Sequence, residues 1–162
     1  QACENVRQSQ WRDSIEVVCS DITKYTPDEV KFDIIVCNPP FFRDSLRSPN
    51  AVRSQARHND SLSYEKLADT VLRLLANDGT FNLVLPFDMA DTFTLIAARR
   101  GLYMSKRTKV VTRQGVAPKR VLLSFVKQQI VHVEEDELVM FDSNNAETLD
   151  YISLVKDFYL KY

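Results

Sequence analysis

The chain has 162 residues, and its 21 lysine and arginine residues nearly balance 22 aspartate and glutamate residues, for a formal net charge of −1. This length fits a single domain with a real hydrophobic core, and no apolar run reaches the roughly 18 residues of a membrane span or suggests a signal peptide. The three cysteines are far apart and lack CxxC spacing. The sequence therefore argues against a disulfide framework and any metal site, and for a reducing, cytoplasmic location.

The first quarter of the chain is predicted to hold one helix and two strands. Residues 2–12 are predicted as the helix, and residues 15–19 as a strand that Ser20 and Asp21 close. Residues 31–37 are predicted as a second strand, apolar on both faces like a central strand of a parallel sheet.

The tetrapeptide Asn38-Pro39-Pro40-Phe41 follows the second strand directly and has the form of a site for methylating an exocyclic amino group. The lone pair of such a nitrogen is delocalised into the base, so a catalyst must hold the group while the lone pair localises. The Asn38 side-chain oxygen and the Pro39 carbonyl can each accept one N–H proton, and the prolines fix the backbone direction. Phe41 offers a face on which a flipped-out base can stack. Alternatively, the two prolines simply end the strand.

Residues 42–60 show no hydrophobic periodicity and are predicted as a long loop, either functional or disordered. Two basic clusters bracket the motif region: Arg43, Arg47, Arg53, Arg57 and His58 in the first, and Lys106, Arg107, Lys109, Arg113, Lys119 and Arg120 in the second. The acids gather instead at residues 134–137, which are interpreted as a turn. Each basic cluster could be a solvated loop, but two of them around a base-binding motif favour a surface that follows nucleic-acid phosphates.

The rest of the chain alternates between helices and strands. A helix is predicted to start at Ser63 and to end at Gly79, followed by a strand at 81–85 that Pro86 stops. Residues 89–100 are predicted as a helix, 103–112 and 120–127 as a hairpin, 138–141 as a strand, and the stretch from Leu149 to Tyr159 as a final helix. This alternation indicates the α/β class.

A glycine-rich turn is missing from the sequence. Only Gly79, Gly101 and Gly115 occur, and none belongs to a G-x-G turn between a strand and a helix. A doubly wound nucleotide-binding sheet normally carries that turn after its first strand and a ribose-binding acid after its second. The chain is therefore interpreted as the later part of a larger domain, without the first two strands and the glycine-rich loop.

Further residues extend the motif to a more specific set. They are Phe42, Arg53, Ala56-Arg57-His58, Leu62, Leu67, the stretch from Leu74-Leu75 to Gly79, Leu85-Pro86, Lys119-Arg120 and the closing Asp157-Phe158-Tyr159-Leu160. On this set, the chain resembles the class I S-adenosylmethionine-dependent methyltransferases and, among them, the bacterial tRNA1(Val) N6-adenine methyltransferases. Residues 1–162 would form the C-terminal part of one methyltransferase domain, with the target-base motif at 38–41, a basic loop at 43–58, and a C-terminal strand and helix at 137–162.

The resemblance implies a Rossmann-like sheet of strand order 3-2-1-4-5-7-6 that methylates the tRNA adenosine 3′ of the anticodon. Carried onto this chain, it makes Asn38, Pro39, Pro40 and Phe41 the catalytic target-base site. It assigns S-adenosylmethionine to Asp21 and Ile22, together with Asn38. The tRNA contacts would be Arg43, Arg53, Arg57, His58, Lys119 and Arg120.

Two alternatives stay open at this stage. One is another amino methyltransferase of the same fold, acting on rRNA guanine N2, DNA adenine N6 or protein glutamine N5. The other is a non-catalytic RNA-binding fragment, because the cofactor half is missing; the chain alone is expected to be inactive. Residues 32–37 would then form an open sheet edge, which is expected to pair with the missing N-terminal segment or with a second copy.

Overall fold

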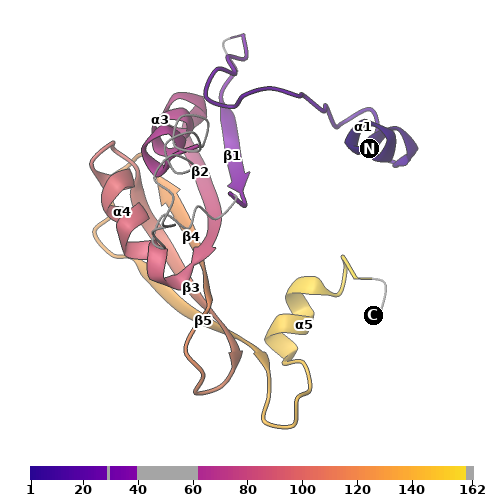
Figure 1. Ribbon diagram of the computed structural model, residues 1–162, viewed down its shortest axis with the longest axis vertical. Helices are drawn as coiled ribbons and strands as arrows, with labels where there is room; N and C mark the ends of the chain where they lie inside the picture. The colour runs from indigo at the N-terminus through magenta and orange to yellow at the C-terminus, as the bar shows by residue number, and fades with distance from the viewer. Residues whose placement is uncertain (29, 40–61, 160–162) are drawn as a thin grey trace, which may run out of the picture.

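The computed structural model describes residues 1–28, 30–39 and 62–159, which form a mixed α/β structure. The elements in chain order are α1 (Ala2–Gln8), β1 (Phe32–Cys37), α3 (Tyr64–Leu74), β2 (Leu75–Pro86), the 3-10 helix η1 (Phe87–Met89), α4 (Ala90–Ala98), β3 (Tyr103–Arg113), β4 (Arg120–Val126), β5 (Glu134–Phe141) and α5 (Leu149–Val155). Figure 1 shows α3 and α4 together on one face of the sheet, while α1 lies away from it and α5 lies beside the end of β5.

The sheet has five strands in the order β1-β2-β4-β3-β5. β1 runs parallel to β2, β4 is antiparallel to both β2 and β3, and β5 runs parallel to β3. If β1 is counted as the fourth strand of the expected sheet, the first four positions read 4-5-7-6, as predicted. β5 extends the sheet beyond the expected order, so that β1 and β5 are its two edges.

The hydrophobic core lies between the sheet and the helices α3 and α4. Phe93 of α4 is fully buried at its centre, with its ring centroid 5.3 Å from that of Tyr64 and 5.4 Å from that of Phe125 in edge-on arrangements. Phe81 of β2 completes this aromatic cluster, 6.2 Å from Phe125. Such edge-on pairs add stabilisation beyond the burial of their area.

Helix α3 begins as predicted but ends earlier. Ser63 caps it by accepting a hydrogen bond from the backbone N–H of Lys66. The helix ends at Leu74, and Gly79, expected at the helix end, instead lies within strand β2. A side chain at Gly79 would place its Cβ 2.9 Å from the backbone oxygens of Phe32 and Asp33, so the glycine allows close contact between β1 and β2 rather than capping a helix.

Two predictions from the sequence, one of a strand and one of a turn, are wrong for a common reason. Residues 15–19 are exposed and form no strand, because no neighbouring strand in the described part of the chain supplies ladder hydrogen bonds. Residues 134–137, expected as an acidic turn, belong to β5, because β3 beside them supplies both the ladder and opposite charges. Whether each of these segments forms a strand thus depends on pairing with a strand that is distant in the sequence.

Strand β1 is an edge strand rather than a central one. Its residues Ile35 and Cys37 pack against the core, whereas the side chains of Ile34 and Val36 on the other face are 65% and 78% exposed. The expected open, apolar edge at residues 32–37 is thus present. In the described residues, no helix is long and apolar enough to cross a membrane.

Candidate active site

The carboxyl ends of β1 and β2 form one edge of the sheet, called the strand-end edge below. Because these strands are parallel and Cys37 pairs with Leu83, Asn38 leaves β1 on the same side as Pro86 leaves β2. Pro86 pairs with Arg120 of the antiparallel strand β4. Ligands of open α/β sheets bind outside the carboxyl ends of the strands, so this edge is the expected place for a site.

Asn38 is exposed at this edge, and the following Pro39 is buried. The buried proline fixes the direction in which the chain leaves β1, while the amide of Asn38 stays accessible to a substrate. Cys37, just before it, is half-buried, and burial raises the pKa of its thiol. The group next to the amide therefore stays neutral, because desolvation disfavours the thiolate.

The 3-10 helix η1 and the start of α3 bring further side chains to the strand-end edge. The N–H of Phe87 donates to the carbonyl of Lys119 at 3.2 Å, which ties η1 to the start of β4. The pKa of Tyr64 is raised by burial and, secondly, by the negative charge of Asp88. Tyr64 and Asp88 therefore lie close enough to interact, one at the first residue of α3 and one in η1.

Arg107 of β3 contacts both η1 and the start of α4. Its guanidinium carbon lies 5.3 Å from the ring centroid of Phe87, and its Nη1 donates to Asp91 Oδ1 at 3.0 Å. The Arg107 side chain is only 15% exposed, so this cation–π contact is largely shielded from water. These contacts of Arg107 hold the ring of Phe87 in place. No local signal in the sequence distinguishes Arg107 from the basic residues around it.

Asp21 heads a short loop, residues 21–25, called the donor loop below. Its Oδ1 accepts hydrogen bonds from the N–H of Thr23 at 3.0 Å and from the Thr23 hydroxyl at 2.7 Å. These bonds hold the pKa of Asp21 below its usual value, so the carboxylate is an ionised acceptor at neutral pH. Beside it, Ile22 is 43% exposed and offers apolar surface. The loop thus presents an ionised acceptor next to an exposed apolar side chain.

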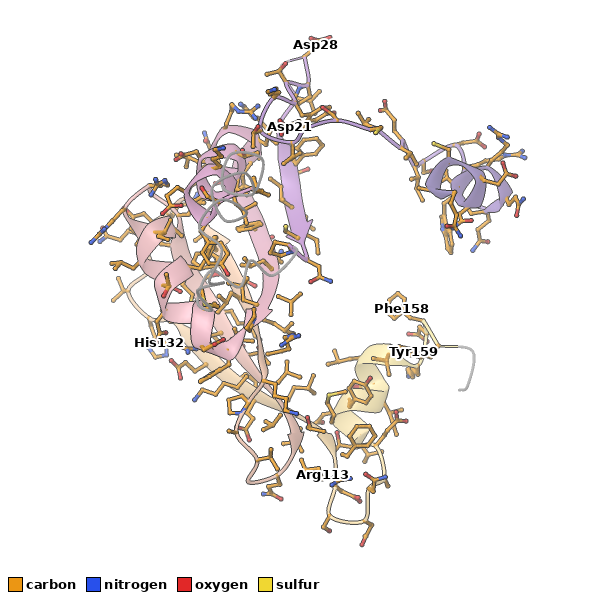
Figure 2. All side chains as sticks on the ribbon, in the orientation of Figure 1. Asp21, Asp28, Arg113, His132, Phe158 and Tyr159 are labelled. Carbon is orange, nitrogen blue, oxygen red and sulfur yellow. The ribbon has the colours of Figure 1, made fainter. Side chains whose placement is uncertain are left out.

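Arg73 in the last turn of α3 fixes the donor loop. Its Nη1 donates to the carbonyl of Tyr25 at 2.6 Å, and its Nη2 lies 3.3 Å from the carbonyls of both Ile22 and Thr23. Figure 2 shows Asp21 beside β1 near helix α3. Sequence reasoning missed Arg73, because an arginine near a helix end is ordinary and its three acceptors are about 50 residues away.

The structure brings some of the predicted site residues together. Asn38, Pro39, Lys119 and Arg120 share the strand-end edge, and Asp21 with Ile22 lies in the donor loop against α3. No hydrogen bond in the described residues joins Asp21 to Asn38. The remaining predicted residues lie outside the described part of the chain: Pro40, Phe41, Arg43, Arg53, Arg57 and His58. No cluster of three potential metal ligands occurs in the described residues.

The strand order and the motif at the end of β1 are those of a class I methyltransferase. Residues 1–112 match the sequence model of the family described as RMKL-like, methyltransferase domain. The crystal structure of a protein described as a predicted O-methyltransferase from Agrobacterium tumefaciens superimposes with a TM-score of 0.64. It is 19% identical and covers 87% of this chain and 62% of its own, a likeness in fold alone.

Relatives with higher identity define the family more narrowly. A protein from Bacteroides fragilis named tRNA1(Val) (adenine(37)-N6)-methyltransferase is 45% identical over 165 residues, which cover 99% of this chain and 68% of the relative. A protein of the same name from Haemophilus influenzae is 38% identical over 163 residues, again covering 68% of the relative. The chain therefore belongs to the family of these methyltransferases.

Proposed function

We propose that the protein methylates N6 of an adenosine in tRNA, the one 3′ of the anticodon, with S-adenosylmethionine as the methyl donor. The observation that carries this proposal is the exposed Asn38 at the carboxyl end of β1, in a chain 45% identical to a protein named for this reaction. A tRNA substrate supports a cytoplasmic location, which is part of the proposal.

Asn38 and Pro39 would hold the reacting amino group. The amide oxygen of Asn38 accepts one N–H of adenine N6, and the carbonyl of Pro39 accepts the other. Both acceptors stabilise the positive charge that develops on the nitrogen as its lone pair localises and the methyl group arrives. The nitrogen becomes acidic only then, so no general base is needed before attack.

The donor loop would hold the adenine of the methyl donor. The Asp21 carboxylate accepts from its amino group, and Ile22 packs against its ring. S-adenosylmethionine supplies an electrophilic methyl group on a sulfonium when bound. The contribution of the protein is then mainly orientation, which can be worth roughly 7–11 kcal/mol in well-aligned reactions. The neutral Cys37 thiol avoids a competing nucleophile next to the transfer.

The phosphates of the tRNA would contact basic side chains around the strand-end edge. Lys119 and Arg120 are exposed there, beside the end of β2. Arg43, Arg53, Arg57 and His58 would add contacts from the segment that follows the motif. Phe41 would stack on the extruded adenine, and Pro40 would keep Phe41 in position.

A methylation assay with Asn38→Ala, made in the full-length protein, tests the proposal. Turnover on a tRNA transcript should fall about a hundredfold or more, the usual scale for losing one preorganised polar contact to a transition state. Binding of S-adenosylhomocysteine, measured by calorimetry, should stay unchanged. The matched control is Asn77→Ala, the same change at an exposed position near the start of β2, which should keep normal turnover.

Near-normal turnover of Asn38→Ala on its RNA would contradict the role of this amide. Transfer to a glutamine-containing peptide or to DNA, with none to tRNA, would favour another amino methyltransferase of the same fold. The free edge of β1 is also proposed to pair with a strand, from a second copy or from a further segment of the protein. Light scattering with mass spectrometry of the purified protein distinguishes the two.

A further inference from the structure

Asp88 is an exposed carboxylate at the strand-end edge. It lies in η1, which follows Pro86 at the end of β2. The N–H of Phe87 donates to the carbonyl of Lys119 at 3.2 Å, so Asp88 is the next residue after the hydrogen bond that joins η1 to the start of β4. A carboxylate is therefore present at the same edge as Asn38, which is proposed to hold the reacting amino group.

Asp88 neither caps a helix nor forms an ion pair in the described residues. Neither η1 nor α4, which follows it, has a side-chain hydrogen bond at its N-terminal cap. Asp91, in the first turn of α4, forms an ion pair with Arg107, with 3.0 Å between Oδ1 and Nη1, and Asp88 has no such partner within residues 1–28, 30–39 and 62–159. The carboxylate of Asp88 is thus available to accept hydrogen bonds from a bound molecule.

Tyr64 lies beside Asp88, and the core holds it in place. Its ring packs edge-on against that of Phe93, with 5.3 Å between the centroids. Burial and, secondly, the charge of Asp88 raise the pKa of Tyr64, so the phenol keeps its proton at neutral pH. Asp88 therefore has, next to its acceptor oxygens, a hydroxyl donor that can orient them.

Lys119 supplies a positive charge close to this carboxylate. It is exposed, and its ammonium forms no ion pair with Asp88 or with another acid in the part of the chain that the structure describes. An ammonium and a carboxylate placed in this way match a ligand that offers an anion and a hydrogen-bond donor side by side. In RNA, the 2′-hydroxyl and the 3′ phosphate are on neighbouring carbons of one ribose, whereas DNA lacks the hydroxyl.

We propose that Asp88 makes the site specific for RNA, because its carboxylate accepts a hydrogen bond from a ribose 2′-hydroxyl while the ammonium of Lys119 contacts the phosphate on the same sugar. Tyr64 orients the carboxylate. The inference rests on the proposed function, since it assumes a nucleic-acid substrate. The carboxylate also repels phosphates, and a deoxyribose strand meets this repulsion without the compensating hydrogen bond. Asp88 thus favours RNA and disfavours DNA.

A double-mutant cycle between protein and substrate, made with the full-length protein, tests the inference. The substrates are anticodon stem-loops, one of them all-ribose and the others with a single 2′-deoxyribose at or next to the target adenosine. In the wild type, deoxyribose at one of these positions should lower kcat/KM about tenfold or more, the scale of a hydrogen bond to a charged group. Asp88→Ala should cause a similar loss on the all-ribose substrate and no further loss on that deoxyribose substrate.

The matched control is Asp28→Ala, which removes an exposed carboxylate before the start of β1, at the opposite end of this strand from Asn38. Figure 2 shows Asp28 at the upper end of the molecule. This variant should keep the wild-type ratio of activity on ribose and deoxyribose substrates. Thermal melting of each variant checks that it is folded.

Tyr64→Phe tests the positioning role, because it removes the hydroxyl and keeps the ring against Phe93. The ratio of activity on ribose and deoxyribose substrates should fall about threefold, the scale of one neutral hydrogen bond. A wild-type ratio in Tyr64→Phe overturns the role of its hydroxyl.

Equal losses of Asp88→Ala on the ribose and deoxyribose substrates overturn the inference, because Asp88 would then not act on the sugar. A wild type that methylates all the stem-loops equally well also overturns it, and in both cases the proposed function stands. A wild type that methylates no tRNA overturns both.

Discussion

The segment from α3 to β4 and the two ends of the chain differ sharply in how they are held. The buried core extends from Leu67 to Phe125, within residues 64–126. Helices α1 and α5 bury no residue, and exposed apolar side chains such as Trp11 and Phe158 are found on the ends. Figure 2 shows Phe158 and Tyr159 beyond α5, away from the sheet. The stability of this chain is therefore concentrated in its middle.

The candidate site depends on both regions. Asn38 follows a strand that packs on the core, and Lys119 and Arg120 start a strand inside the sheet. The donor loop belongs to the loosely held N-terminal region and is attached to the middle through Arg73. Regions with few buried contacts open most readily, so the donor loop should be the more easily disturbed half of the site.

The largest difference between the regions should appear on removing an aromatic ring. Phe93→Ala leaves a cavity among Tyr64, Phe81 and Phe125 and should lower the free energy of unfolding by about 3–5 kcal/mol. Trp11 is larger but 58% exposed, so Trp11→Ala should change the free energy of unfolding by less than about 0.5 kcal/mol. Urea denaturation followed by circular dichroism measures both; similar losses would contradict the contrast.

A smaller loss is expected where β1 joins the middle of the chain. Gly79→Ala forces a Cβ against two backbone oxygens of β1 that have no flexible side chain to yield. Overpacking of this kind costs about 1–3 kcal/mol. Asn77→Ala, two residues earlier and exposed, serves as the control in the same denaturation experiment. If Gly79→Ala left the free energy of unfolding unchanged, β1 would not lie this close to β2.

Weakening the attachment of the donor loop should affect this loop and not the stability of the whole protein. Arg73→Gln removes the hydrogen bonds to the carbonyls of Ile22, Thr23 and Tyr25, one of them exposed and two part-buried, which together contribute at least about 1 kcal/mol. Hydrogen exchange at residues 22–25 should therefore speed up at least about fivefold, and affinity for S-adenosylhomocysteine should fall. Arg99→Gln, an exposed arginine at the end of α4, should change neither. Unchanged exchange in Arg73→Gln would contradict the attachment.

The smallest effect concerns the thiols and leaves stability untouched. Cys3 and Cys19 are exposed on the N-terminal region, whereas Cys37 is half-buried beside Asn38 and its pKa is raised by burial. A raised pKa means less thiolate at a given pH, so iodoacetamide should modify Cys37 more slowly at pH 7. The Cys37 rate should climb as the pH increases. Mass spectrometry of the modified peptides measures the rate at each cysteine. Faster modification of Cys37 than of Cys3 and Cys19 would contradict the prediction.

The sequence predicted the elements whose signals are local. Ser63 caps α3, Pro86 ends β2, and the hairpin of β3 and β4 forms where alternation and the Gly115 loop indicated it. Features that depend on distant partners could not be predicted in this way. Gly79 looks like a helix cap until β1 is placed against it, and the acids at 134–137 look like a turn until β3 lies beside them.

The site shows the same division. Asn38 and Pro39 were identified from their neighbours in the sequence, because the motif carries its chemistry within a few residues. Arg73 and Arg107 act across the fold, on the carbonyls of the donor loop and on the ring of Phe87. A single arginine in a helix or a strand has no local signature of such a role, so only the spatial arrangement reveals it.

The two edges of the sheet set a limit on how copies of this chain can assemble. The β1 edge is apolar and open, with Ile34 and Val36 exposed, whereas the β5 edge carries four consecutive acids. Like charges oppose the approach of two β5 edges to each other, so pairing of β5 with β5 is disfavoured. Pairing of β1 with β1 uses the same patch twice and closes on itself about a two-fold axis. A pair formed in this way has both β1 edges covered and leaves only the acidic β5 edges of the described sheet exposed, so it does not grow further by edge pairing.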